Sequence, residues 1–339
     1  MRTDDFDYPL PPERIAQTPI EPRHASRLLV LNRSSGELEH TTFWNLTDYL
    51  YPGDLLVINQ TRVLPARIFA RKPTGGRVEV LLLRREDALT WEALIGGKHV
   101  KPGTLLKIEG GPDVEVVEML EVARRRVRFS QPVEPTLEKI GQMPLPPYIH
   151  TRLDNPERYQ TVYSQEAGSA AAPTAGLHFS PELMAALRQK GVGICPVTLH
   201  VGLDTFAPVT EDDPQTHLIH TEWCELTPAA AGEINRVSRD GGRIVAVGTT
   251  SVRTLETAAR FAASGERVGA FSGPTDLFIL PGYGFRAVDV MITNFHLPRS
   301  TLLMLVSAFA GRERMLAAYQ TAVEMEYRFF SFGDAMLIL

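Results

Sequence analysis

The feature that most constrains the fold is a run of short alternating segments between Arg62 and about Arg128. Apolar and polar residues alternate there with a period near two, as in ARIFAR, RVEVLLLRR, VEVVEMLEV and RRVRFS, and turn residues such as Gly110-Gly111-Pro112 separate the segments. This pattern is typical of short strands, which usually close into a small barrel or sandwich because open sheet edges tend to pair with other chains. The sequence therefore predicts an antiparallel β-barrel domain over residues 62–147, ending at a proline-rich linker.

The rest of the chain alternates helices with single apolar strands, which is typical of an α/β layer. Ser180-Pro181 and Thr227-Pro228 are expected to begin helices, with a capping hydroxyl followed by a proline in the first turn. Apolar strands follow at ICPVTLHV and RIVAVG, and LLVLN and DLLVIN before the barrel have the same character. Later strands are expected at 289–292 and 335–339, and helices at 300–310 and 314–327. We predict the α/β fold class, with residues 1–61 and 148–339 forming one discontinuous α/β catalytic domain into which the barrel is inserted.

Charge and cysteine content limit the classes of function. The chain of 339 residues has 35 Lys and Arg against 40 Asp and Glu, a net charge of −5, so any nucleic-acid site must be local. Its two cysteines are too few for a secreted disulfide framework. The apolar stretches are shorter than the ~20 residues that span a bilayer, so we expect a cytoplasmic protein without a membrane partner. We also expect a monomer.

Histidines gather in loop-like segments of the α/β part. His178, His200, His217, His220 and His296 are candidate acid/base groups, although each could instead satisfy a buried hydrogen bond. Two of them, with Glu222, lie in the segment HLIHTE, which could be read as a metal site. The spacing is not HExxH, and in an extended chain His220 and Glu222 share a face, which favours an acid/base or hydrogen-bonding pair over a metal site.

Three further segments are candidates for ligand binding. The segment Gly248-Thr249-Thr250-Ser251 joins an apolar strand to a helix, where an anion could dock, although N-capping by Thr249 or Thr250 explains it equally well. Residues 168–179 and 293–301 combine small residues with Thr, Asn and His, which suits close approach of a ligand. On the barrel, residues 124–128 form the densest basic run, which could also be a solvated strand face.

Taken together, these motifs resemble the S-adenosylmethionine:tRNA ribosyltransferase-isomerase family of queuosine biosynthesis, nearly end to end. The matching stretches are FDYPLPPERIAQTPIEPRHASRLLVL, GDLLVINQTRVLPAR, YQTVYSQEAGSAAAPTAGLHF, VTLHVGLDTFAPV, HLIHTE, GGRIVAVGTTSVRTLE, VDVMITNFHLPRSTLLMLVSAFAG and YRFFSFGDAMLI. The chain departs from the family pattern at three positions: Gln60, where the family usually has Asp; Asp204, where it usually has Gly; and Phe332, where it often has Tyr.

The resemblance implies transfer and isomerisation of the ribosyl part of S-adenosylmethionine, the co-substrate, onto 7-aminomethyl-7-deazaguanine (preQ1) at the wobble position of tRNA. Adenine and methionine leave and epoxyqueuosine forms, with no metal or second cofactor. The family fold is likewise an α/β domain with an inserted barrel. We expect His178, His220 and Glu222 to be catalytic, because such a reaction needs a base at C5′ of the ribose and an acid for departing adenine.

The substrate pocket is expected where the polar segments meet, near strand ends and helix starts. The residues expected to bind substrate are Arg23, Asn59, Thr61, Arg62, Thr174, Gly176, His200, Gly202, Thr205, His217, Gly248, Thr249, Thr250, Arg253, Thr293, Asn294, His296, Ser300 and Asp334. We expect Arg124, Arg126 and Arg128, together with Arg84 and Arg85, to contact tRNA phosphates, because residues two apart share one face of a strand.

Two other functions compete with this one. A methyltransferase would share S-adenosylmethionine but normally has a glycine-rich loop after its first strand, and the sequence has none. A non-enzymatic RNA-binding protein would explain the barrel and its arginines but leaves the polar motifs of the α/β part without a purpose.

Overall fold

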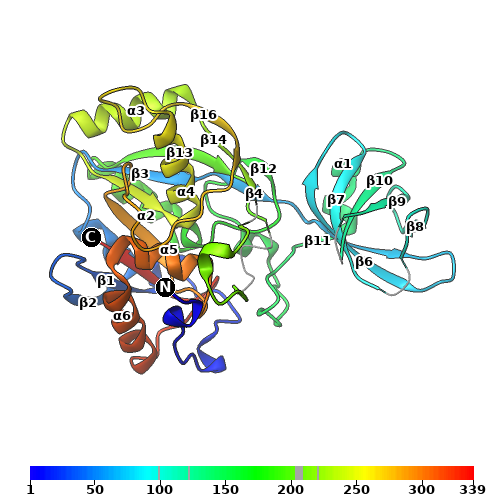
Figure 1. Ribbon diagram of the computed structural model, residues 1–339, viewed down its shortest axis with the longest axis horizontal. Coiled ribbons are helices and arrows are strands. Elements are labelled where there is room, and N and C mark those ends of the chain that lie inside the picture. Colours follow the sequence, from blue (N-terminus) through cyan, green and yellow to red (C-terminus); the bar gives the residue numbers. More distant parts are fainter. Residues whose placement is uncertain (98–99, 121–122, 203–208, 220) are drawn as a thin grey trace. The chain divides into compact units, whose positions relative to one another are not determined.

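The computed structural model describes residues 1–97, 100–120, 123–202, 209–219 and 221–339. Its chain divides into two compact units (Figure 1). Unit 1 contains residues 1–61, 147–166 and 172–339, and unit 2 contains residues 62–146 and 167–171. The return of the chain at 167–171 to unit 2 was not anticipated from the sequence.

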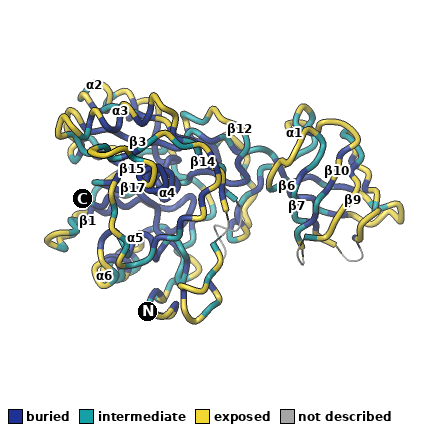
Figure 2. The backbone as a smooth tube through the Cα atoms, turned by 45° about the horizontal axis from the view of Figure 1, so that its top comes forward, coloured by how far each residue is buried: buried dark blue, intermediate teal, exposed yellow. Residues whose placement is uncertain are grey.

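Unit 1 is built on a mixed 9-stranded sheet. Its order is β16 (Phe271–Thr275), β14 (Glu222–Leu226), β13 (Gly193–Leu199), β3 (Leu55–Asn59), β15 (Ile244–Val247), β17 (Val290–Asn294), β18 (Ala335–Ile338), β1 (Arg27–Leu31), β2 (Leu38–Thr42). The four central strands β13, β3, β15 and β17 are parallel. The innermost of them, β3, β15 and β17, are buried throughout, which matches their unbroken apolar sequences (Figure 2).

Helices cover both faces of this sheet (Figure 1). One face packs on α3 (Pro228–Arg239), α4 (Gly248–Ala258), α5 (Thr301–Ala310) and α6 (Arg312–Glu324). The other packs on α2 (Pro181–Gln189) and on the 3₁₀ segments η4 (Phe43–Asp48) and η6 (Thr174–His178). Ser180 and Thr227 cap α2 and α3 as expected, by accepting from the amides of Leu183 and Ala230.

Parallel strands bring the predicted motifs to one edge of the sheet. Val197 of β13 pairs with Asn59 of β3, and Val247 of β15 pairs with both Ile58 and Ile292. The segments that follow β3, β13, β15 and β17 therefore leave from the same, carboxyl edge. Open α/β sheets bind their ligands at this edge.

Unit 2 is a closed antiparallel barrel. Its strands follow the order β5 (Arg67–Arg71), β6 (Arg77–Arg85), β7 (Thr90–Ile95), β10 (Arg124–Phe129), β9 (Val114–Met119), β8 (Leu105–Ile108), and β8 pairs back with β5. Helix α1 (Glu134–Ile140) and strand β11 (Gly141–Gln142) follow, with β11 paired to β5. The predicted α/β fold with an inserted barrel is confirmed.

Some local features differ from the expectation. The last strand and the last two helices run over slightly shifted ranges, with α6 beginning two residues before the predicted start and ending at Glu324. Strand β4 (Thr61–Val63) pairs with β12 (Glu166–Ser169), a small sheet with no clear sequence signal. Short 3₁₀ segments occupy η1 (Thr3–Phe6), η2 (Pro12–Arg14), η3 (Arg23–Ala25), η5 (Pro156–Tyr159), η8 (Pro214–Thr216) and η9 (Ala259–Phe261). Within the described ranges, every helix is too short or too polar to cross a bilayer.

Candidate active site

A buried hydrogen-bond network joins η6 to the end of β17. Asn294 donates from Nδ2 to Nε2 of His178 at 3.0 Å, and its Oδ1 accepts from the Thr174 hydroxyl at 3.0 Å. Because Nε2 accepts, Nδ1 of His178 carries the proton and donates to the Ser26 hydroxyl at 2.8 Å. Burial, with help from nearby Arg328 and Arg23, lowers the pKa of His178 to about 3. His178 is therefore a neutral ring with both nitrogens bonded, which holds Asn294 in place.

A buried ion pair joins α4 to the start of β14. The Arg253 guanidinium contacts Oε2 of Glu222, and both side chains are almost fully buried. The other carboxylate oxygen of Glu222 accepts from the amide of Gly202 at 2.8 Å. Arg253 also donates to the carbonyl of Leu277 at 3.2 Å. Glu222 thus fixes Arg253 and the backbone that follows β13.

A third cluster surrounds His200, the residue after β13. The Thr61 hydroxyl lies 2.8 Å from Nδ1 of His200 and donates its own proton to the carbonyl of Glu166 at 3.3 Å. Nδ1 of His200 must then be the donor to Thr61, which leaves the lone pair on Nε2. Burial lowers the pKa of His200, opposed by Glu166, so the ring is neutral near pH 7. Among the described residues nothing hydrogen-bonds to Nε2, so this nitrogen is available as a proton acceptor.

Helix α4 begins directly at Gly248, which has a φ of +84°. Thr249 and Thr250 lie inside the first turn, and no side chain caps the helix at Val247, so the N-capping alternative is wrong. The Thr250 hydroxyl is buried without a hydrogen-bond partner among the described residues. A Cβ on Gly248 would lie 3.4 Å from Cβ of Ala175, so this helix start packs against η6.

The last segment of the site follows β17. The Thr293 hydroxyl lies 2.7 Å from Nε2 of His296, whose pKa burial lowers to about 3. Ser300 caps α5 by accepting from the amide of Leu303 at 3.2 Å. A cavity of about 30 Å³ lies between these residues and the η6 network. Its lining includes Tyr148, Thr174, Asn294, His296, Ser300 and Ser331. This volume holds a water molecule but not a nucleoside.

The predicted pocket segments are therefore linked by direct contacts. Residues 168–179 reach the segment after β17 through Thr174 and His178, and reach the start of α4 through Ala175. Glu222 links HLIHTE to both Gly202 and Arg253. His220 and Thr205 lie outside the described residues.

Other residues expected to bind substrate have structural partners. Asn59 bridges β3 to β13 through Leu199, and Arg23 donates to the carbonyls of Leu177 and Glu157. Burial lowers the pKa of Arg23 to about 10. Asp334 accepts from the amides of Arg27 and Arg328 at 2.9 and 2.8 Å, and burial raises its pKa. Arg62 is half-buried in β4.

His217 contacts a carboxylate. Its Nδ1 lies 2.9 Å from the Glu211 carboxylate, and this contact lowers the pKa of Glu211. Over the part of the chain that the structure describes, no three His, Cys, Asp or Glu side chains group around a common point as metal ligands would. Of the departures from the family pattern, Gln60 donates to the Thr198 hydroxyl at 3.3 Å and Phe332 packs edge-on to Tyr159, while Asp204 lies outside the described residues.

Gly176 of η6 is required by close packing. A Cβ at this position would contact the Tyr163 hydroxyl and lie 2.7 Å from Cγ2 of Thr161. We expect Gly176→Ala to lower the free energy of unfolding by about 1–3 kcal/mol, because overpacking forces neighbours to move. Denaturant titration measures this loss, and adding Tyr163→Phe should restore part of it.

Gly232→Ala is the matched control, because its Cβ meets nothing within 4 Å and alanine favours the helix. Equal stability of Gly176→Ala and the parent would contradict this packing.

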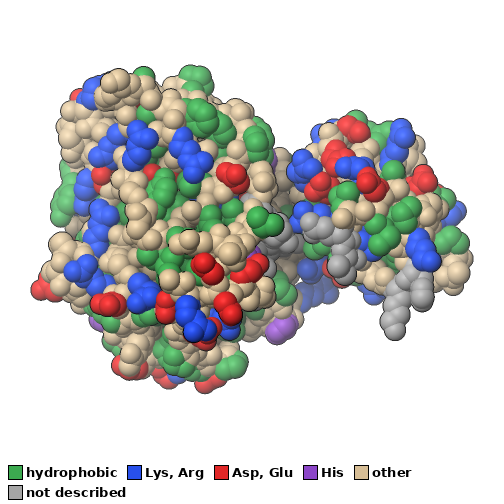
Figure 3. All heavy atoms as spheres, viewed as in Figure 1, with side chains coloured by type: hydrophobic (Ala, Val, Ile, Leu, Met, Phe, Trp, Pro, Cys, Tyr) green, Lys and Arg blue, Asp and Glu red, His purple; other side chains and the backbone are tan. Residues whose placement is uncertain are grey.

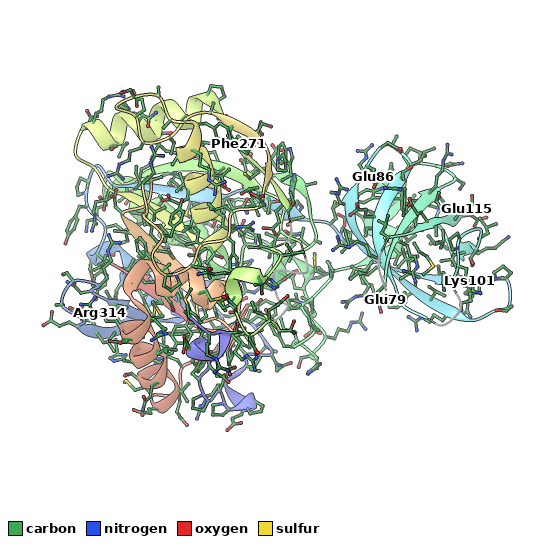
Figure 4. All side chains as sticks on the ribbon, viewed as in Figure 1. Glu79, Glu86, Lys101, Glu115, Phe271 and Arg314 are labelled. Atoms are coloured by element: carbon green, nitrogen blue, oxygen red, sulfur yellow. The ribbon has the colours of Figure 1, made fainter. Side chains whose placement is uncertain are left out.

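Carboxylates lie among the arginines of the basic run on the barrel and of strand β6. Along β10, Arg124, Arg126 and Arg128 face outward, whereas Arg125 is buried. Arg126 pairs with both Glu86 and Glu118. Glu86, labelled in Figure 4, follows β6, where Arg84 pairs with Glu92 at 2.5 Å and Arg85 with Glu134 at 2.9 Å. Positive and negative side chains are accordingly interspersed on the barrel face seen in Figure 3.

Sequence reasoning missed some members of these clusters. Ser26 and Glu166 lie in stretches that carry the family resemblance, but neither stands out by residue type. Trp223, whose ring stacks on His200, was also missed. The signal that could have identified it is its position directly after the candidate residue Glu222 on the same short strand.

The chain is similar along its whole length to known proteins. The sequence pattern described as "Queuosine biosynthesis protein" matches residues 3–338. Relatives named S-adenosylmethionine:tRNA ribosyltransferase-isomerase include those of Symbiobacterium thermophilum, 56% identical, and Moorella thermoacetica, 55% identical, each aligned over 100% of both chains. The crystal structure of S-adenosylmethionine tRNA ribosyltransferase from Thermotoga maritima is 41% identical, with a TM-score of 0.58 over 99% of this chain and 100% of that one. The predicted resemblance is confirmed, and the chain belongs to the queuosine biosynthesis protein family.

Proposed function

We propose that this enzyme transfers the ribosyl part of S-adenosylmethionine, its co-substrate, onto preQ1 at the wobble position of tRNA and isomerises it. The products are epoxyqueuosine-tRNA, adenine and methionine. The proposal is supported above all by the joining of the polar segments at the carboxyl edge of the sheet. The names of the relatives supply the reaction class and the class of both substrates.

The chemistry requires proton acceptors and one proton donor. A sulfonium acidifies the adjacent C5′ hydrogens, so a base there begins the rearrangement, and departing adenine needs an acid. The attacking amine must also be neutral. We assign the base to His200, because Nε2 of its neutral ring has a lone pair without a partner among the described residues.

The other expected catalytic residues take different roles in this proposal. His178 is a positioning residue, because both its nitrogens are already bonded and its lowered pKa keeps it uncharged. Glu222 orients Arg253 through the buried ion pair. His220, two residues before Glu222 in the sequence, remains the proposed acid.

Incubation with S-adenosylmethionine and preQ1-bearing tRNA tests the function. Release of free adenine and methionine in equal amounts is expected. Release of S-adenosylhomocysteine would instead identify a methyltransferase, and tRNA binding without turnover would identify a binding protein. Light scattering of the active sample tests the monomeric state that we propose.

Arg124, Arg126 and Arg128 are proposed to contact tRNA phosphates. Replacing all three by glutamine should raise the KM for tRNA and reduce the slope of log affinity against log salt by about 0.7 for each single-strand phosphate that is no longer neutralised. Arg126 also pairs with Glu86 and Glu118, so these carboxylates compete with phosphate for its guanidinium. Arg77→Gln is the control, because Arg77 lies over the Phe69 ring elsewhere on the barrel. An unchanged salt slope in the triple variant would mean that these arginines form only a solvent-exposed strand face and do not contact tRNA.

A further inference from the structure

An exposed aromatic pair lies beside the proposed base. Trp223 is the second residue of β14, and its carbonyl accepts from the amide of His200 at 3.0 Å, so the two residues are direct cross-strand neighbours. Their rings are stacked, with centroids 5.5 Å apart and an interplanar angle of 19°. Trp223 nevertheless remains 39% exposed. A flat indole is thus presented to solvent, backed by a neutral imidazole.

The other tryptophans are placed differently. Trp91 is buried in the barrel. Trp44 is exposed, but its ring is tilted by 51° to its neighbour His24. Trp223 is therefore the tryptophan whose ring is both exposed and held parallel to a partner. Burying an indole against a ligand ring recovers apolar area that is otherwise left in water.

The surroundings of this pair indicate which ring it receives. His200 is held by Thr61, which also contacts Glu166, so the pair is fixed at the carboxyl edge of the sheet. The cavity near His296 has a volume of only about 30 Å³, too small for a base, whereas Trp223 lies at an exposed strand position. Proteins read single-stranded RNA by stacking unstacked bases on exposed aromatic side chains.

We propose that Trp223, backed by His200, is a stacking platform for an unstacked base of the RNA substrate. This inference rests on the proposed function and adds to it a residue that positions the polynucleotide. The base lies on the exposed part of the indole, which is held in place by its stacking on His200. Adenine of S-adenosylmethionine is the other ring that could stack there, and the experiment distinguishes the two.

Steady-state kinetics of Trp223→Leu test the platform. We expect the KM for tRNA to rise by roughly 5- to 150-fold, the range for removing one base-aromatic stack, while kcat and the dissociation constant of S-adenosylmethionine stay near those of the parent. Trp223→Phe keeps a flat ring and should return the KM to within about fivefold of the parent. Phe261→Leu is the matched control, because Phe261 is exposed and stacked at 19° on Phe271 of β16, which Figure 4 labels.

Binding of the anticodon stem-loop alone separates this inference from the proposed function. If the parent binds the stem-loop and Trp223→Leu binds it more weakly, the platform stands even when no adenine is released. An unchanged KM and an unchanged stem-loop affinity in Trp223→Leu would overturn the platform. Weaker binding of S-adenosylmethionine with an unchanged KM for tRNA would also overturn it, because the stacked ring would then be adenine.

Discussion

Replacing Arg253 by methionine should lower the free energy of unfolding by about 3–5 kcal/mol, because it leaves the Glu222 carboxylate buried without its charged partner. The side chains of this pair are 7% and 4% exposed, so water cannot replace the guanidinium. Gly202 would still donate a hydrogen bond to Glu222, but a neutral amide does not replace the lost positive charge. Urea titration followed by circular dichroism measures the loss.

Two comparisons make this result specific. Arg236→Met removes an arginine whose i,i+4 partner Asp240 is 3.4 Å away and which is mostly exposed, so stability should change by less than about 0.5 kcal/mol. The double variant Glu222→Met/Arg253→Met removes both charges and should recover most of the loss. The buried pair would not be the cause if Arg253→Met were no less stable than Arg236→Met.

Much of the fold could be predicted because local pattern and burial coincide. The apolar runs at β3, β15 and β17 are buried on both faces, as their sequences indicate, and α2 and α3 begin at their capping residues Ser180 and Thr227. The barrel strands alternate because one face lines the core and the other meets water. In β7, for example, Trp91, Ala93 and Ile95 are buried and the residues between them are half-buried.

The contacts inside the site could not be predicted in the same way. His178 is bonded to Ser26 and Asn294, which are 152 and 116 residues away in sequence. Such pairings depend on strand register, and a shift of one residue would turn every side chain to the opposite face. For the same reason, nothing in the local sequence indicates that Trp223 lies opposite His200. Residue type identified the histidines as candidates, but only their hydrogen-bond partners separate a base from a structural ring.

Replacing His200 by glutamine should lower kcat by about 10²–10⁴-fold, because glutamine can still donate to Thr61 but offers no basic lone pair. The dependence on pH provides a second test. Burial lowers the pKa of His200 from 6.5, so the neutral, active ring persists below that pH. As the pH falls through the lowered pKa, the base becomes protonated and kcat/KM declines. The acid limb of the pH profile, which is the fall of kcat/KM at low pH, should therefore have its midpoint below pH 6.5.

His40→Gln is the matched control for this experiment. Burial and nearby Arg27 also lower the pKa of His40, but its ring lies on the outer strand β2 and bonds to Tyr327. This variant should keep both the rate and the acid limb of the parent. His200→Gln should lose the limb together with the rate, because the titrating group is gone. If His200→Gln instead kept kcat within about threefold of the parent and retained the same limb, the proton would be taken by another group, and His220 would be the next histidine to replace.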